Sequence, residues 1–350
     1  MDVTQALAQL GLTRHLAGAD LPGADLSGQD LSNCHFEGVH LTSANLAGSK
    51  LDGSVFQNCD LSGVNLTQAQ LQGVQMQVVN LQGARLASVN AQGASFGMVE
   101  FSGAQASSAN FSGAMFEACR FEATDLSHAL FVKADCNQCI FLGTNFSASN
   151  LTRWTVMDTD LSSIRLDRSC LAQAYLKGCN LTGLVFTGCD VTMTIFNAAQ
   201  LQKASFSNMA LDRTSFIAAQ MQGAVLAGVK GQYTALLEAN LSQADLQRSY
   251  FDMSDVSDAD FSGANAEGSS WNMSVFQRSK LMQANFSAAS FKDCDMSHAD
   301  LSAANFSSAH IAGCNLHALN ASNTRWDGAQ RISNRETDAA LAKAEQWQAA

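Results

Sequence analysis

The chain has 350 residues, 47% of them hydrophobic, and its 31 acidic and 20 basic residues give a formal net charge of −11. This acidic balance disfavours phosphate neutralisation, so we expect no direct nucleic-acid partner. The chain contains no run of about 18 apolar residues and no basic segment before an apolar run, which argues against a membrane span and a secretory signal and predicts a cytoplasmic protein. Ten cysteines in such a chain are expected to be reduced thiols.

The first expected element is a short helix. Val3, Ala6, Leu7 and Leu10 recur at helical spacing after Asp2, and Gly11 ends the run. We therefore predict a helical cap over residues 1–18 that closes the first coil of the repeat region described next.

A five-residue repeat dominates residues 19–330. Every fifth position from Leu21 is a centre that is nearly always large and apolar: Leu21, Leu26, Leu31, Phe36, Leu41, Leu46, Leu51, Phe56 and onward to Trp326. All 20 phenylalanines lie on this one phase. Neither the helical period of 3.6 nor the strand period of 2 sustains that spacing. The chain must turn at every fifth residue.

A second inward position lies two residues before each centre and holds small residues such as Ala19 and Ala24. Eight of the ten cysteines occupy it: Cys34, Cys59, Cys119, Cys139, Cys179, Cys189, Cys294 and Cys314. Asp or Asn stands between the two inward positions in many units, as in Ala24-Asp25-Leu26. Such short side chains hydrogen-bond nearby backbone at turns.

With its Ala-(Asp/Asn)-Leu-X-X unit, the sequence resembles the pentapeptide-repeat family over nearly its whole length. The resemblance implies an all-β fold, a right-handed quadrilateral parallel β-helix with four units per coil and about 15 coils over residues 19–330. Because solenoids grow in one dimension, we expect a single repeat domain.

Two departures from the repeat stand out. Gly231 occupies a centre, where a missing side chain would leave a void or distort the backbone and bend the solenoid. Trp154 is oversized for the small inward position, and the smaller Val156 at the next centre suggests a volume exchange in the core.

A helix is predicted within residues 331–350. Ser333-Asn334-Arg335-Glu336 matches a capping box, and Leu341, Ala344 and Trp347 share one face of a helix that reaches about Gln348. Two roles stay open for this face: a monomeric cap, or the homodimer contact that the resemblance to gyrase-directed members implies.

The sequence offers no catalytic constellation, so we predict that the protein is not an enzyme and needs no cofactor or metal. Cys136 and Cys139 have metal-ligand spacing, but both lie on inward phases and no second pair completes a four-ligand set. The seven histidines lie on outward phases and are expected to be solvated: His15, His35, His40, His128, His298, His310 and His317.

Residues that repeat every 20 positions share one face, and the face centred on Phe36, Phe56 and Met76 is the most apolar. A predicted partner-binding stripe on it comprises Met157, Tyr175, Ile195, Ile217 and Leu237, with Glu238, Asp255 and Asp258 in its acidic rim. Contiguous exposed apolar surface marks partner sites. The alternative is that isolated outward apolar residues are ordinary surface.

These observations favour a non-enzymatic scaffold or adaptor that binds another protein through an acidic and apolar face. The alternative function is DNA mimicry, in which the acidic solenoid binds DNA gyrase or another topoisomerase and protects or inhibits it. The resemblance implies this alternative, and the net charge of −11 agrees with it.

Overall fold

The computed structural model describes residues 2–345. The chain divides after Tyr175 into two compact units, which we call unit 1 and unit 2. The strands of unit 1 are β1 (His15–Ala17), β2 (His35–Glu37), β3 (Val55–Gln57), β4 (Gln75–Gln77), β5 (Ser95–Gly97), β6 (Met115–Glu117), β7 (Asp135–Asn137) and β8 (Thr155–Val156). Unit 2 contains β9 (Ser290–Lys292), β10 (His310–Ala312) and β11 (Gln330–Ile332). Helices α1 (Val3–Thr13) and α2 (Ala339–Glu345) belong to units 1 and 2.

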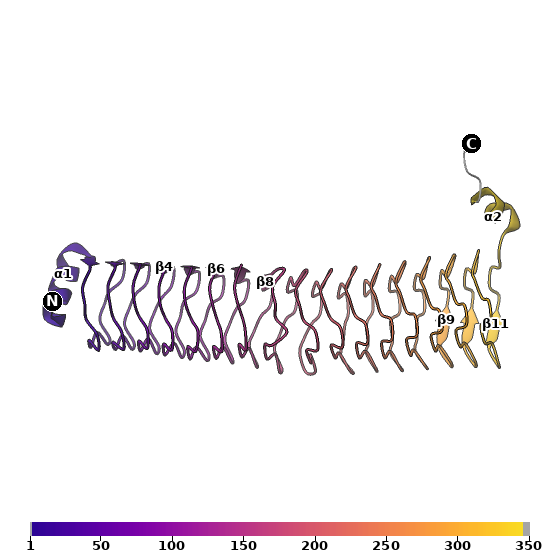
Figure 1. Cartoon of the computed structure of the whole chain (residues 1–350), viewed down its shortest axis with the longest axis horizontal. Coiled ribbons are helices and arrows are strands. Elements are labelled where there is room, and N and C mark those ends of the chain that lie inside the picture. Colours follow the sequence, from indigo (N-terminus) through magenta and orange to yellow (C-terminus); the bar gives the residue numbers. More distant parts are fainter. Residues whose placement is uncertain (1, 346–350) are drawn as a thin grey trace. The chain divides into compact units, whose positions relative to one another are not determined.

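Each unit is a parallel β-solenoid. Strands β1–β8 stack in chain order as one parallel sheet in unit 1 (Figure 1), and β9–β11 form a second parallel sheet in unit 2. Partner residues are 20 apart, as in Phe36↔Phe56. Single parallel bridges with the same separation, such as Asp25↔Asn45, join the other sides of the coil. A coil is therefore four pentapeptides, which confirms the predicted fold.

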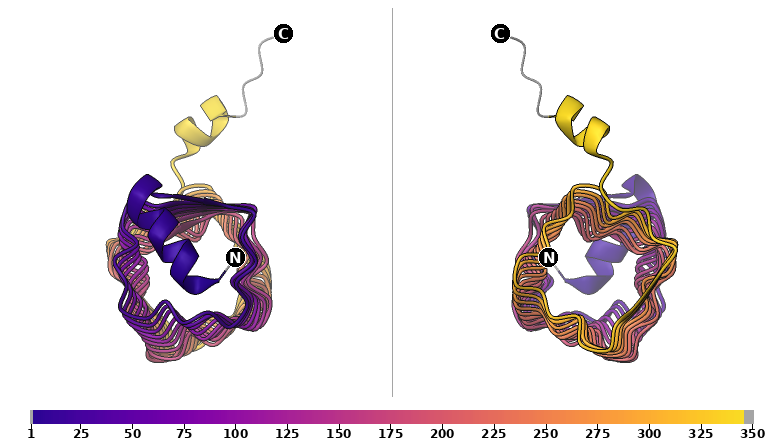
Figure 2. Two further views of the ribbon diagram at one scale, coloured as in Figure 1. Left: turned by 90° about the vertical axis from the view of Figure 1, so that its left-hand side faces the viewer. Right: turned by 90° about the vertical axis from the view of Figure 1, so that its right-hand side faces the viewer.

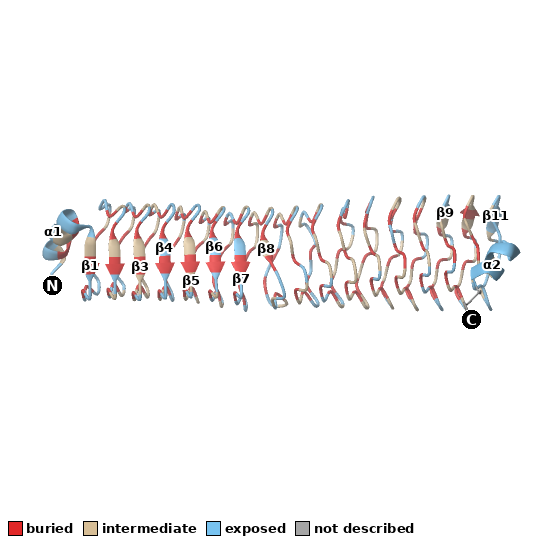
Figure 3. Ribbon diagram, turned by 90° about the horizontal axis from the view of Figure 1, so that it is seen from above, coloured by how far each residue is buried: buried red, intermediate tan, exposed pale blue. Residues whose placement is uncertain are grey.

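The two inward positions form the core. The centres are buried along β2–β7 while their outward neighbours stay accessible (Figure 3). Equivalent rings on adjacent coils stack: the centroids of Phe36 and Phe56 lie 4.5 Å apart, and those of Phe101 and Phe121 lie 4.8 Å apart. The phenylalanine phase of the sequence is therefore a stack of rings inside the solenoid.

The Asp and Asn residues between the inward positions bond the turns, as predicted. The backbone N–H of Ser27 donates to Asp25 Oδ1 at 3.1 Å. The same oxygen accepts from the side-chain amide of Asn45 at 3.0 Å, and Asn65 donates likewise to Asn45 at 2.9 Å. Hydrogen bonds from Ser27 lower the pKa of Asp25. These side chains thus join adjacent coils as well as closing turns.

The corner of most pentapeptides, two residues after the centre, has a left-handed backbone. Gly23 has φ +67° and Asn33 φ +53°, and most of the 25 glycines occupy such corners. Glycine and asparagine adopt this conformation at little cost, whereas a bulky side chain there is strained. Val78 (φ +56°) and Met98 (φ +51°) are bulky residues at corners of adjacent coils.

Helix α1 covers the first coil, as predicted. Asp2 forms a capping box with Gln5, and Ala6 and Leu10 are buried. The helix lies across the end of the coil (Figure 2). Two boundaries were wrong: the helix runs through Gly11 to Thr13, and the coil begins at β1 rather than at Ala19, because β1 already pairs with β2.

The predicted capping box at Ser333–Glu336 was wrong. The chain still follows the coil there, because Asn334 Oδ1 accepts the backbone N–H of Cys314 and Arg335 N–H donates to Cys314 O. Helix α2 begins later, where Asp338 Oδ1 accepts the N–H groups of Ala340 and Leu341. It projects to the side of the coil (Figure 2). Leu341 and Ala344 are exposed, and Trp347 lies outside the described residues.

Both departures from the repeat are packed into the core. Trp154 is fully buried, and its indole N–H donates to Cys136 Sγ at 3.2 Å. At Gly231, a Cβ would collide with Thr234 and lie 3.2 Å from the ring of Phe251. These side chains fill the predicted void, and the bridge ladder of unit 2 continues on both sides of it, at Ala210↔Lys230 and Ser215↔Ala235.

Candidate partner-binding surface

The predicted stripe is divided between the units. In unit 1, Met157 is exposed and Tyr175 half-buried. In unit 2, Ile195, Ile217 and Leu237 are all half-buried. Ile217 and Leu237 occupy equivalent positions on adjacent coils, whereas the bridge partner of Ile195 is Ser215. The stripe residues of unit 2 therefore present less apolar surface than the spacing predicts.

The acidic residues predicted to flank the stripe lie in unit 2. Glu238 and Asp255 are exposed. Asp258 is half-buried and accepts from Arg278 at two atoms, Nε at 2.8 Å and NH2 at 2.6 Å. The hydrogen bond from Arg278 lowers the pKa of Asp258. Its charge is therefore compensated by the protein, which makes it less available to a partner than Glu238 or Asp255.

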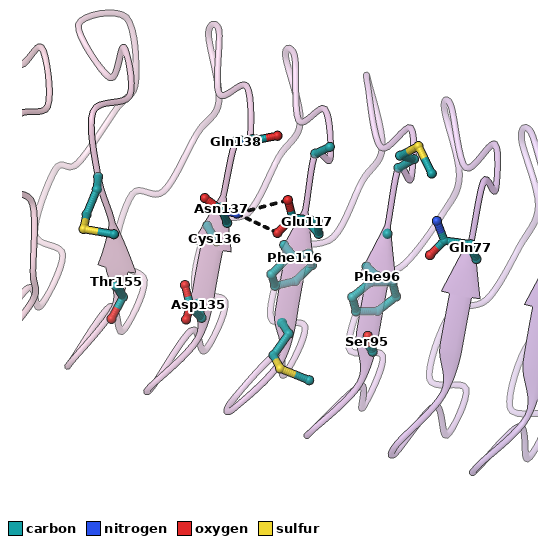
Figure 4. A pocket seen from close by; sticks show the side chains of 15 residues that line it. Gln77, Ser95, Phe96, Phe116, Glu117, Asp135, Cys136, Asn137, Gln138 and Thr155 are labelled. Carbon is teal, nitrogen blue, oxygen red and sulfur yellow. Dashed lines mark hydrogen bonds between the residues drawn. The ribbon is translucent and has the colours of Figure 1, made fainter.

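A better-formed surface lies over strands β4–β8 of unit 1, where a depression of about 790 Å³ follows the sheet. We call it the Gly97 groove (Figure 4); it is lined by Gln77, Ser95, Phe96, Gly97, Met98, Met115, Phe116, Glu117, Ala118, Asp135, Cys136, Asn137, Gln138, Thr155 and Met157. It lies on the predicted face and contains one stripe residue, Met157.

The strand register explains the groove. Gln77, Gly97, Glu117 and Asn137 align across β4–β7 on the outward side of the sheet. Gly97 interrupts this row, and the Gln77 side chain approaches so closely that a Cβ at Gly97 would collide with its Oε1. Because Gly97 has no side chain, the outward row has a gap here that only the end of the Gln77 side chain enters.

Large apolar side chains border the gap. Met98, Met115 and Met157 are 53%, 58% and 47% exposed. Val78, at 45% exposure, occupies the coil next to Met98 and lines a neighbouring depression with it. Val78 and Met98 both have the strained left-handed backbone, and neither offsets that cost by burial. The sequence did not single out these corners, because many residues other than glycine, such as Lys203 and Tyr233, share the same backbone conformation.

The groove carries negative charge. Glu117 accepts from the side-chain amide of Asn137 at 2.8 and 3.0 Å (Figure 4), a neutral donor that leaves its charge uncompensated. Asp135 is exposed on the opposite side of the central row of side chains. The 15 lining residues include no lysine or arginine. The surface thus pairs flexible apolar side chains with two available carboxylates.

The thiols beneath the groove belong to the core, as predicted. Cys136 and Cys139 are buried free thiols. Burial raises the pKa of Cys136 well above its ordinary value. The Cys136 thiol is therefore protonated and a poor nucleophile.

One histidine is not solvated as predicted. His317 is 5% exposed because α2 and the preceding segment lie over it, and its ring contacts Glu345 and the backbone of Asp338. Its outward phase was identified correctly, but its cover comes from a segment whose path the repeat does not specify.

No helix of residues 2–345 is long and apolar enough to cross a membrane. Solved structures share the repeat architecture at low similarity. HetL, a pentapeptide repeat protein of the cyanobacterium Nostoc sp. strain PCC 7120, is 19% identical over 67% of this chain and 86% of its own, with a TM-score of 0.28. QnrB1, a plasmid-mediated fluoroquinolone resistance protein, is 18% identical over 62% of this chain and 91% of its own, with a TM-score of 0.34.

A pentapeptide repeat protein of the Arabidopsis thaliana thylakoid lumen is 36% identical over 28% of this chain and 68% of its own, with a TM-score of 0.27. No curated protein matches the chain. A pentapeptide repeat region model matches residues 13–86 and 29–106. An eight-copy pentapeptide repeats model matches 119–153, 159–197, 194–230, 232–263, 239–270, 259–297 and 279–317. The chain belongs to the pentapeptide repeat family.

Proposed function

We propose that the protein is a non-enzymatic adaptor whose Gly97 groove binds another protein. The observations that carry the proposal are the exposed methionines of the groove, Met98, Met115 and Met157, together with the strained left-handed backbone of Met98 and of Val78 on the adjacent coil. Strain without burial destabilises the fold, and strained residues cluster at binding sites. Exposed methionines adapt to a partner surface.

The partner's chemistry follows from the lining. Apolar side chains such as Leu or Met would contact Met98, Met115 and Met157, and a lysine or arginine would pair with Glu117 or Asp135. Stripe residues Ile217 and Leu237, with Glu238 and Asp255, remain a second candidate surface on unit 2, and Ile217→Asp with Leu237→Asp tests it.

Asparagine substitutions test the groove without harming the fold. Asn33 and Asn58 adopt φ +53° at equivalent corners, so Val78→Asn and Met98→Asn suit the backbone while removing apolar surface. We expect the double variant to be as stable as wild type or more stable by roughly 1 kcal/mol, and to lose the partners that wild type captures in a crosslinking pull-down.

Leu142→Asn is the matched control, because Leu142 is 59% exposed in unit 1 outside the groove. It should keep every partner. Retention of all partners by the Val78 and Met98 variant would contradict the proposal. A gyrase supercoiling assay tests DNA mimicry, which the net charge of −11 favours: inhibition or protection at micromolar protein supports it, and no effect removes it.

The C-terminal coil supports a further part of the proposal, a homodimer contact. Its strand β11 is exposed at every residue, and Trp326 and Leu341 add accessible apolar surface to this end of unit 2. Uncovered strand edges pair readily with a second chain. Analytical ultracentrifugation should show a dimer that Trp326→Asp converts to a monomer; a monomeric wild type at all concentrations contradicts this contact.

A further inference from the structure

Two histidines and a glutamate meet where α2 joins the last coils of unit 2. His317 Nε2 lies 3.1 Å from Glu345 Oε2, and His298 Nε2 lies 3.5 Å from Glu345 Oε1. One ligand atom from each residue lies within 4.8 Å of the others. We propose that His298, His317 and Glu345 form a binding site for a divalent transition-metal ion such as Zn²⁺.

The coil places the two histidines side by side. The backbone N–H of His298 donates to His317 O at 2.9 Å, so the residues lie on adjacent coils, and their ring centroids are 5.4 Å apart at 78°. The His317 side chain is 7% exposed and therefore confined. A metal site needs preorganised ligands, and here two of the three come from the rigid solenoid.

Ligand type and spacing both suit zinc. Two histidines and one glutamate with an open fourth position form an established Zn²⁺ donor set. Ligand bonds of about 2.0–2.2 Å in tetrahedral geometry place two donor atoms roughly 3.4 Å apart. The separations of 3.1 and 3.5 Å bracket that value, so small side-chain adjustments would place Zn²⁺ between the donors.

The surroundings favour a cation and leave room for water. The cluster lines a depression of about 570 Å³. Its charged lining comprises the carboxylates of Asp295, Glu336, Asp338 and Glu345 and the guanidinium groups of Arg278 and Arg335. Arg278 pairs with Asp258 and Glu336 pairs with Arg331, so three carboxylates remain beside one uncompensated arginine. A solvent molecule in the depression can supply the fourth ligand.

Metal binding competes with two existing hydrogen bonds of His317. The backbone N–H of Asp338 donates to His317 Nδ1 at 3.1 Å, so the ion-free ring carries its proton on Nε2 and donates it to Glu345. Coordination through Nε2 moves that proton to Nδ1, so it breaks both the hydrogen bond from Asp338 and the hydrogen bond to Glu345. Three metal–ligand bonds outweigh these two hydrogen bonds, and Asp338 lies in the short connection to α2.

Equilibrium dialysis of the full chain against Zn²⁺ tests the site. We expect one bound ion per chain, and a loss of affinity of at least about tenfold in His298→Ala, His317→Ala and Glu345→Gln. His310→Ala is the matched control, because His310 contacts Gln330 away from the cluster. Glu345→Gln preserves size, so its loss of binding with an unchanged circular dichroism spectrum isolates the ligand role.

The ten free cysteines require a second readout. Bound Co²⁺ should lack a thiolate charge-transfer band, and Zn²⁺ should slow trypsin cleavage after Lys343 in wild type but not in Glu345→Gln. Equal Zn²⁺ affinity of wild type and the three variants, or a thiolate band from the single bound Co²⁺, would overturn the proposal.

Discussion

The first coil of unit 1 and the last coil of unit 2 follow the same repeat but differ in how they end. Helix α1 buries Leu10 against the first coil, whose centre Leu16 is 1% exposed. In the last coil, Ala321 is exposed and Trp326 half-buried, and Arg331 stands at the centre of β11 where β9 and β10 have Phe291 and Ile311.

The difference shows that the repeat alone does not make a core. An inward residue of a solenoid is buried by the coils on both sides of it, so the terminal coil needs another element over its open end. Unit 1 has that element in α1, while α2 lies beside the coil of unit 2. An apolar residue at the same repeat position therefore contributes more to the free energy of unfolding in a covered coil than in an open one.

Two tryptophans at centre positions give the strongest test. Trp271 is fully buried, contacts Phe251 and donates its indole N–H to Ser269 Oγ at 2.8 Å, whereas Trp326 stacks loosely on Phe306 under Arg331. Trp271→Ala should destabilise unit 2 by about 3–5 kcal/mol in urea unfolding. Trp326→Ala should cost less than about 1.5 kcal/mol at a concentration where the protein is monomeric. Equal losses would show that the last coil is covered in solution.

A leucine in each helix gives the next test. Leu10 is 2% exposed in α1, and Leu341 is 47% exposed in α2. Leu10→Ala removes a buried side chain and should cost about 2–4 kcal/mol, whereas Leu341→Ala should change the free energy of unfolding by less than about 0.5 kcal/mol. Chemical denaturation at a concentration where the protein is monomeric measures both, and a large cost at Leu341 would indicate that α2 packs on a surface.

The sequence was sufficient to predict the coil, its inward positions and α1, because all of these depend on contacts that recur every five or 20 residues. It did not identify the strained corners at Val78 and Met98, since phase alone distinguishes inward from outward but not backbone conformation. It overestimated the exposure of Ile217 and Leu237 because coils are only about 4.8 Å apart and outward side chains shield one another.

The burial of His317 and the late start of α2 had another cause. Both depend on where the chain leaves the coil after Arg335, and no repeat constrains that path. The Gly97 groove is an intermediate case: it lies on the face that the sequence identified as most apolar, but the gap arises from the register of Gly97 with Gln77 and Glu117.

Lowering the pH should distinguish Asp295, which accepts several hydrogen bonds, from an exposed aspartate. Burial raises the pKa of Asp295, but hydrogen bonds from Gln277, Ser297 and Asn315 outweigh it and lower the pKa below 3.8. The stability it contributes is therefore present above about pH 4 and is lost as pH falls through the lowered folded value. Asp295→Asn should cost about 1–2 kcal/mol at pH 7 and less at pH 3.

Asp327 is the matched control in the last coil, where it is 79% exposed and meets Arg325 at 3.4 Å. Asp327→Asn should leave the free energy of unfolding unchanged at both pH values. Thermal or urea unfolding at pH 7 and pH 3 measures the differences. A pH-independent cost at Asp295 would mean that its side chain stabilises the coil by packing rather than by accepting hydrogen bonds as a carboxylate.

The smallest expected effect concerns two exposed ion pairs. Arg278 binds Asp258 through Nε and NH2, at 2.8 and 2.6 Å, whereas Arg325 reaches Asp327 through one contact at 3.4 Å. An arginine that donates two hydrogen bonds to one carboxylate holds its geometry better than one with a single contact. Both guanidinium groups are nevertheless exposed and screened by salt. In low salt, Arg278→Ala should lower the free energy of unfolding measurably, whereas Arg325→Ala should leave it unchanged.

The pKa of Asp258 is lowered by its hydrogen bond from Arg278, so the contribution of this pair is present above about pH 4 and lost as pH falls through the lowered folded value. Urea unfolding of both variants in low salt and in about 1 M NaCl provides the measurement. The two variants should lose different amounts of unfolding free energy in low salt and equal amounts in high salt. If the difference persists in high salt, the loss in Arg278→Ala comes from lost packing of its aliphatic stem, since packing is insensitive to screening.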